Sequence, residues 1–179
     1  MSILLTNQVQ SLAGKKILGI TGSILQVVST TITSTFTTTS VMTTSGGGAA
    51  VTGLSAVITP SSTSNKILVL VALNAAGQGN GTQAFAYIAR GSTPIGTGAA
   101  EGSRPGIGGR YYYNDSNVSG MIWMQFLDSP ATTNSLTYNV YVGTETGGAT
   151  TYVNRTQSDG NQINGARGSS TITVMEIVA

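Results

Sequence analysis

The sequence contains no histidine and no cysteine, and only eight basic and six acidic side chains occur among its 179 residues. Most enzyme chemistry near neutral pH uses a titrating imidazole, a thiolate, paired carboxylates or a metal ion. The first two are excluded, and the others would have to be assembled from six acids scattered along the chain. We therefore expect no enzyme, no cofactor and no metal site, and predict a protein that acts through structure or binding.

Charge is scarce throughout the chain, and hydroxyl groups take its place. Charged residues make up 8 % of the sequence, against about 25 % in typical soluble domains. Serine and threonine together number 47, and their hydrogen bonds are not screened by salt as ion pairs are. This composition suits a surface buried against other subunits or an extracellular particle. The eight cations do not cluster, so we expect no nucleic-acid partner.

Neither end of the sequence nor its interior predicts membrane association. The first ten residues lack the basic segment of a signal peptide. The longest strongly apolar run, residues 67–73, is far too short to cross a bilayer. We expect a chain made in a cytoplasm, with no membrane partner.

Apolar residues recur with period two, and turn formers interrupt them at short spacing, which predicts antiparallel β-structure. We expect an all-β, jelly-roll-like β-sandwich of about 8–10 strands over residues 24–179, preceded by a short N-terminal arm at residues 1–23. The residues Thr146-Gly147-Gly148 favour a hairpin. The predicted strands are residues 24–31, 33–39, 54–59, 66–74, 83–90, 119–127, 136–142, 150–156 and 170–178.

The predicted strand at residues 66–74 is apolar without alternation, which indicates burial of both its faces. One face would fill the core and the other would meet a neighbouring copy in a trimer. Its candidate core and interface residues are Ile67, Leu68, Val69, Leu70 and Val71.

The best candidate for a recognition surface lies in residues 104–117. Tyrosine and arginine favour interfaces because each combines contact area with a polar group. The alternative is an ordinary strand start with Tyr111 and Tyr113 packed inward, and the sequence does not decide between them. The candidate residues are Arg104, Arg110, Tyr111, Tyr112 and Tyr113.

Neither residues 154–161 nor the glycine clusters have the pattern of a ligand-binding loop. Residues 154–161 contain one carboxylate and one cation, without the repeated acids of a calcium loop, and are better explained as a polar surface loop. The glycine clusters lack the spacing of phosphate-binding loops and are better explained as turns.

Several segments in order along the chain resemble a module found on the virion surface of tailed bacteriophages. The resemblance implies a trimeric, all-β surface module without catalysis, and it carries over no functional site. The matching segments are residues 25–29, 53–60, 64–71, 88–96, 126–130, 152–155 and 167–176.

The composition, the predicted fold and the resemblance suggest three candidate functions. The leading one is a homotrimeric decoration or cement protein on the capsid exterior, made in the host cytoplasm and bound to the major capsid protein or another virion protein. Residues 1–23 would anchor it, with Lys15 and Lys16 as candidate contacts. The second is a tail-fibre or spike tip that binds host glycan through Tyr111, Tyr112 and Tyr113. The third, and least favoured, is a glycan hydrolase.

Overall fold

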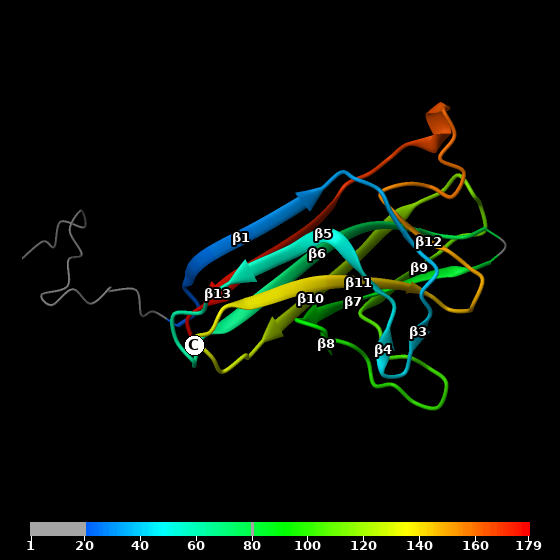
Figure 1. The fold of residues 1–179 in the computed structure, drawn as a ribbon. Coiled ribbons are helices and arrows are strands. Elements are labelled where there is room, and N and C mark those ends of the chain that lie inside the picture. Colours follow the sequence, from blue (N-terminus) through cyan, green and yellow to red (C-terminus); the bar gives the residue numbers. More distant parts are fainter. Residues whose placement is uncertain (1–20, 80) are drawn as a thin grey trace, which may run out of the picture.

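The computed structural model describes residues 21–79 and 81–179, which form thirteen β-strands and one short 3₁₀ turn, η1 (Ile163–Gly165) (Figure 1). No helix in these residues is long and apolar enough to cross a membrane. The strands are β1 (Ile24–Ile32), β2 (Phe36–Thr38), β3 (Met42–Thr43), β4 (Gly46–Gly47), β5 (Ala49–Ile58), β6 (Lys66–Gly77), β7 (Gln83–Arg90), β8 (Thr93–Ile95), β9 (Gly109–Tyr112), β10 (Gly120–Asp128), β11 (Leu136–Thr144), β12 (Thr151–Val153) and β13 (Ser170–Ile177).

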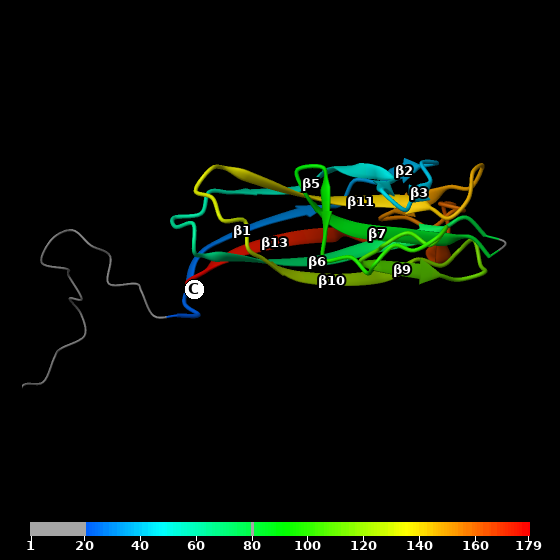
Figure 2. The same cartoon turned by 90° about the horizontal axis from the view of Figure 1, so that it is seen from below.

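Eight of these strands pair as one long antiparallel ribbon folded over on itself. β1 pairs with β13, β5 with β11, β6 with β10, and β7 with β9. The ribbon wraps so that successive pairs alternate between two sheets, with orders β1-β13-β6-β10 and β5-β11-β7-β9. This nested pairing is the strand order of a jelly roll. The predicted fold class is therefore confirmed, and Figure 2 shows the two layers from the side.

The remaining strands extend or cover the two sheets. β12 pairs with the end of β6 and with β2, while β8 pairs with the end of β7. β3 and β4 form a small separate hairpin. The turn at Gly147 and Gly148 does not make the predicted hairpin, because it leads from β11 in one sheet to β12 in the other.

Alternating side chains of both sheets fill the space between the layers. β6 contributes Ile67, Val69 and Val71, and β11 contributes Tyr138 and Val140, each at most 3 % exposed. Burying a large apolar side chain stabilises the fold by about 1.5–3 kcal/mol. The alternation in residues 136–142 predicts Leu136, Tyr138, Val140 and Val142 inward, and the last three of these are buried in β11.

The long strand β6 is less buried than its sequence predicts. Ile67, Val69 and Val71 lie in the core, but Leu68 and Leu70 point to the opposite face and are partly exposed. The chain therefore buries only one face of β6 by itself. Burial of the other face requires a partner and stays a prediction.

The sequence pattern predicts no strand in the glycine-rich residues 91–109. The structure places β8 within this stretch, and β9 begins at its end. At the start of the domain, Gly22 N–H donates to Val178 and Val178 N–H donates to Ser23, so the last residues of the predicted arm join the sheet end. Lys15 and Lys16 lie outside the described residues.

Candidate interaction surface

The outer face of the β1-β13-β6-β10 sheet is the most unusual surface of the described chain, and we call it the open face. The pairing registers place its side chains in continuous cross-strand rows. It consists of Val27, Ser29, Thr31, Leu68, Leu70, Ala72, Asn74, Met121, Trp123, Gln125, Leu127, Thr171, Thr173 and Met175.

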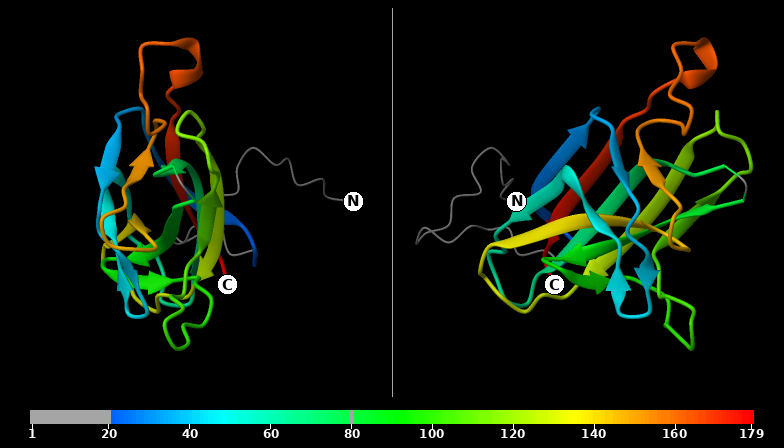
Figure 3. Two further views of the ribbon diagram at one scale, coloured as in Figure 1. Left: turned by 90° about the vertical axis from the view of Figure 1, so that its right-hand side faces the viewer. Right: turned by 45° about the vertical axis from the view of Figure 1, so that its right-hand side comes forward.

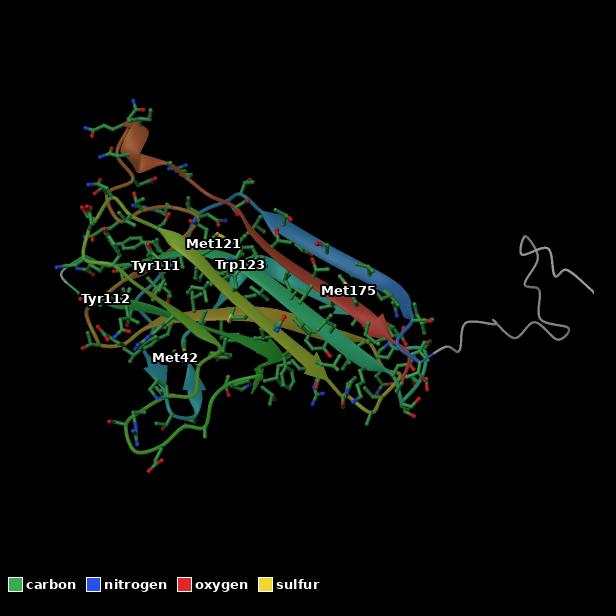
Figure 4. The ribbon with its side chains drawn as sticks, turned by 180° about the vertical axis from the view of Figure 1, so that it is seen from behind. Met42, Tyr111, Tyr112, Met121, Trp123 and Met175 are labelled. Atoms are coloured by element: carbon green, nitrogen blue, oxygen red, sulfur yellow. The ribbon has the colours of Figure 1, made fainter. Side chains whose placement is uncertain are left out.

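None of these fourteen side chains is charged, and the cation Lys66, the exposed first residue of β6, borders them on the same face. Four large apolar ones protrude from the sheet: Trp123 is 72 % exposed, Val27 54 %, Leu127 47 % and Met121 38 %. Figure 4 looks onto this face and shows Met121, Trp123 and Met175 spread across it. The remaining side chains include six that are polar but uncharged, among them the hydrogen-bonded pairs Ser29–Thr173 and Thr31–Thr171. Clusters of exposed large apolar side chains are uncommon on soluble monomers and mark sites of association.

A shallow depression of about 470 Å³, which we call the Trp123 hollow, lies within the open face. It forms because the large indole of Trp123 stands beside the small side chains of Ala72 and Thr171, which share its cross-strand row. Leu70, Gln125 and Thr173 complete its wall. The hollow is lined by apolar and hydroxyl groups and has one amide at its edge.

Part of the outer face of the other sheet is covered by the chain's own β3-β4 hairpin and loops. Phe85 and Tyr87 of β7 are buried under Met42 and Ile107. Tyr87 stacks on Tyr141 with ring centroids 5.1 Å apart and donates a hydrogen bond of 2.8 Å to the carbonyl of Gly47. Burial, and then the nearby Tyr141, raise the pKa of Tyr87 to about 12. No segment of residues 21–79 and 81–179 covers the open face in this way.

The structure divides the predicted tyrosine and arginine cluster. Tyr111 points inward and packs against the core and the backbone of Gly120, whereas Tyr112 and Tyr113 are about half exposed. Burial, and then the neighbouring Tyr113, raise the pKa of Tyr111. Arg110 donates to Gln83 on β7.

Arg104 does not join this group. It lies in the loop between β8 and β9, where it forms an exposed ion pair with Glu101 (3.7 Å). Tyr112 and Tyr113 thus lie with Arg110 toward the end of the sandwich that also carries η1, which we call the loop end. Figure 4 shows this for Tyr112.

Each of the six acids has a structural partner. Asp128 binds Arg90 (2.9 Å) and Tyr138 (2.7 Å) across the core, and burial together with this hydrogen bond raises the pKa of Tyr138. Asp115 accepts from Asn117, and Glu145 accepts from Gln83. No three acids gather in residues 21–79 and 81–179 as metal ligands would. The acids therefore make contacts that hold strands and loops together.

Sequence reasoning missed the shape of residues 154–168, which we call the projecting loop. The loop extends beyond the end of the sandwich (Figures 1 and 3) and carries Ile163 at its tip, where this side chain is 99 % exposed. Its single carboxylate, Asp159, faces two arginines, Arg155 at 3.6 Å and Arg167 at 2.7 Å. These contacts account for the polar character of residues 154–161, which form a surface loop as predicted.

No protein-family model matches the sequence, and no curated protein matches it at a significant level. Among solved structures, the chain is similar to one in the infectious bursal disease virus Gx strain, with 15 % identity, a TM-score of 0.40 and coverage of 86 % of this chain and 37 % of that one. It is also similar to the VP2 subviral particle of infectious bursal disease virus, with 14 % identity, a TM-score of 0.33 and coverage of 86 % and 38 %. The chain spans well under half of either viral chain, and the likeness is one of fold alone.

Proposed function

We propose that the protein is a structural component of a tailed-phage virion, a homotrimer that decorates the capsid exterior and stabilises the head. The observation that carries this proposal is the open face of a jelly-roll domain, whose fourteen side chains carry no charge and include four exposed large apolar groups. Jelly rolls are a common architecture of capsid proteins, although the fold alone does not set function. The resemblance of the sequence to a phage surface module supports the same assignment.

The physical reason for self-association is the cost of leaving the open face in water. Apolar area removed from water contributes about 25 cal/mol per Å², and a stable interface buries about 800 Å² on each partner. The fourteen side chains carry no charge that a covering neighbour would have to desolvate, and Lys66 lies at the border of the face, so burial meets little electrostatic opposition. Copies joined in this way would clamp neighbouring capsid subunits mechanically, without any reaction.

Imaging of virions that contain the protein tests its location directly. Head decoration predicts three-fold protrusions repeated over the whole capsid surface, with many copies in each particle. A few copies confined to the tail tip would contradict decoration and favour the second function given below.

We further propose that the residues preceding the domain attach the trimer to the head, with Lys15 and Lys16 among the contacts. Deleting residues 1–20 should abolish binding to heads that lack the protein and leave the oligomer intact. The cut should stop there because Gly22 and Ser23 hydrogen-bond to Val178 at the sheet end. Co-sedimentation with heads and the sedimentation mass of the shortened chain are the two measurements. Undiminished binding of the shortened chain would contradict the anchor.

A second candidate function is recognition of host glycan by a tail-fibre or spike tip. The observation favouring it is the pair of half-exposed rings of Tyr112 and Tyr113 at the loop end of the sandwich. The loop that follows them is held by hydrogen bonds from Ser158 to Ser116, which limit its freedom. Exposed aromatic rings on an ordered loop offer flat apolar faces and hydroxyl groups to a sugar.

Replacing Tyr112 and Tyr113 with alanine should weaken any glycan binding at least about tenfold, because interface tyrosines contribute most of the energy in such contacts. The fold should survive, since neither ring is buried. Binding to a glycan array or to host cells measures the effect. Arg104→Ala is the control, because Arg104 pairs with Glu101 outside this group. Equal losses in both variants, or no glycan binding by the intact chain, would contradict the second function.

A further inference from the structure

The projecting loop is built to hold its tip in one position. At its base, Asn154 is buried and donates to the carbonyls of Ile32 and Ser34, while Gly168 N–H closes the loop onto Asn154. The backbone at Gly165 comes so close to Gly160 that a side chain at Gly165 would clash with that carbonyl. The loop is therefore narrow at its neck as well as fixed at its base.

A network of arginines braces the middle of the loop. Arg167 donates two hydrogen bonds to Asp159, of 2.9 and 2.7 Å. Arg155 donates to the carbonyls of Thr156 and Gln157 and lies over the ring of Tyr152, 5.1 Å from its centroid. The hydrogen bonds from Arg167 lower the pKa of Asp159, so the brace stays ionised under mildly acidic conditions. A preordered loop loses less conformational entropy when it binds.

The tip beyond this brace has no charge, and Ile163 is its large apolar side chain. An isoleucine that is 99 % exposed on an ordered loop gains more from burial than any other side chain of the loop. The tip lies beyond the end of the sandwich, far from Trp123 at the middle of the open face (Figures 3 and 4). It therefore cannot fill the Trp123 hollow of its own chain.

We propose that Ile163 of one copy docks in the Trp123 hollow of the next copy. This inference rests on the proposed self-association and names the residues that would carry it. Both surfaces belong to the same chain, both are uncharged, and one is convex where the other is concave. A contact between two different surfaces of one chain is head-to-tail, and such contacts close into rings when the rotation between copies permits. In a closed ring of three copies, every Ile163 is docked and every Trp123 hollow is filled.

The absence of cysteine from the native chain allows a cross-linking test with no background. Ile163→Cys and Gln125→Cys place one thiol at the loop tip and one at the exposed edge of the hollow. We expect mild oxidation of the double variant to give disulfide-linked dimers and trimers on a non-reducing gel. Mixing the two single variants should give a linked dimer, which shows that the bond joins different copies.

The control pairs Ile163→Cys with Val57→Cys, because Val57 is similarly exposed but lies on the other sheet. This pair should remain largely unlinked. Ile163→Asp should also weaken association at least about tenfold, whereas Ile163→Val should change it little. Sedimentation of the same samples separates the outcomes. An oligomer that does not cross-link, or that links equally well through Val57→Cys, overturns the docking inference and leaves the proposed function standing. A monomeric native chain overturns both.

Discussion

Replacing Trp123 with glutamate is expected to convert the oligomer into folded monomers. The indole is 72 % exposed in the single chain, so the change removes almost nothing from the core. In the assembly it would place a carboxylate where the neighbouring side chains of the open face include no cation, since Lys66 lies three cross-strand rows away at the start of β6. An unpaired buried charge costs about 3–5 kcal/mol, which corresponds to association weakened at least about a hundredfold. Sedimentation velocity over a range of concentrations measures the shift.

Val57→Glu is the matched control for this experiment. Val57 is an apolar strand residue that is 53 % exposed, but it lies on β5 at the outer face of the other sheet. The substitution adds the same charge to the chain without touching the open face. Its oligomeric state at each concentration should equal that of the native chain. Thermal unfolding should show that both variants fold. An unchanged oligomer in Trp123→Glu, or equal dissociation in both variants, would show that the open face is not the interface.

The sequence predicted the long strands well because their signal is local. Alternation along residues 119–127 separates Ile122 and Met124 from Met121 and Trp123, and the structure places the first pair inside and the second outside. Pairing between strands could not be predicted in the same way, since β1 and β13 lie at opposite ends of the domain sequence. The outer face of β7 is buried because the β3-β4 hairpin places Met42 on it and the loop before β9 places Ile107 there. No local sequence pattern predicts where these two segments pack.

The candidate recognition cluster shows how far sequence proximity can mislead. Successive residues of a strand point to opposite faces, so Tyr111 and Tyr112 on β9 could not share one surface. Arg104 is separated from them because the chain turns back on itself through the contact with Glu101. The exposed tip at Ile163 gave no signal, because isoleucine in a polar loop has no periodic pattern around it. The buried partners of Glu176 were equally hidden, since Gln26 and Asn65 are more than 100 residues away.

Glu176 on β13 is expected to be the most sensitive polar residue of the fold. Its side chain is 1 % exposed and has no cation beside it. The carboxylate accepts hydrogen bonds from Gln26 (2.6 Å), Asn65 (2.6 Å), and the backbone N–H and hydroxyl of Ser61 (2.7 and 2.8 Å). These bonds fasten the turn between β5 and β6 to β1 and β13 of the open-face sheet. Both oxygens are needed as acceptors.

Glu176→Gln should destabilise the fold by about 3 kcal/mol, because the new amide group would present hydrogens to donors that already point at it. Urea unfolding at neutral pH measures the loss. Glu145→Gln makes the same chemical change at an exposed carboxylate with one side-chain partner, Gln83, and should shift stability by less than about 0.5 kcal/mol. Equal stability of the two variants would show that the Glu176 contacts do not hold the turn.

Acidification should narrow the difference in the free energy of unfolding between the native chain and Glu176→Gln. Burial alone would raise the pKa of Glu176, but the four hydrogen bonds outweigh it and hold the pKa below the ordinary value of 4.5. A carboxyl group whose pKa is lower in the folded state binds its proton first in the unfolded state. Its stabilisation is therefore complete above that ordinary value and is lost as the pH falls through the folded pKa. Urea unfolding of both proteins from neutral pH down to acid follows this loss. A difference that stays constant across the range would mean that the ionised carboxylate is not what the four donors stabilise.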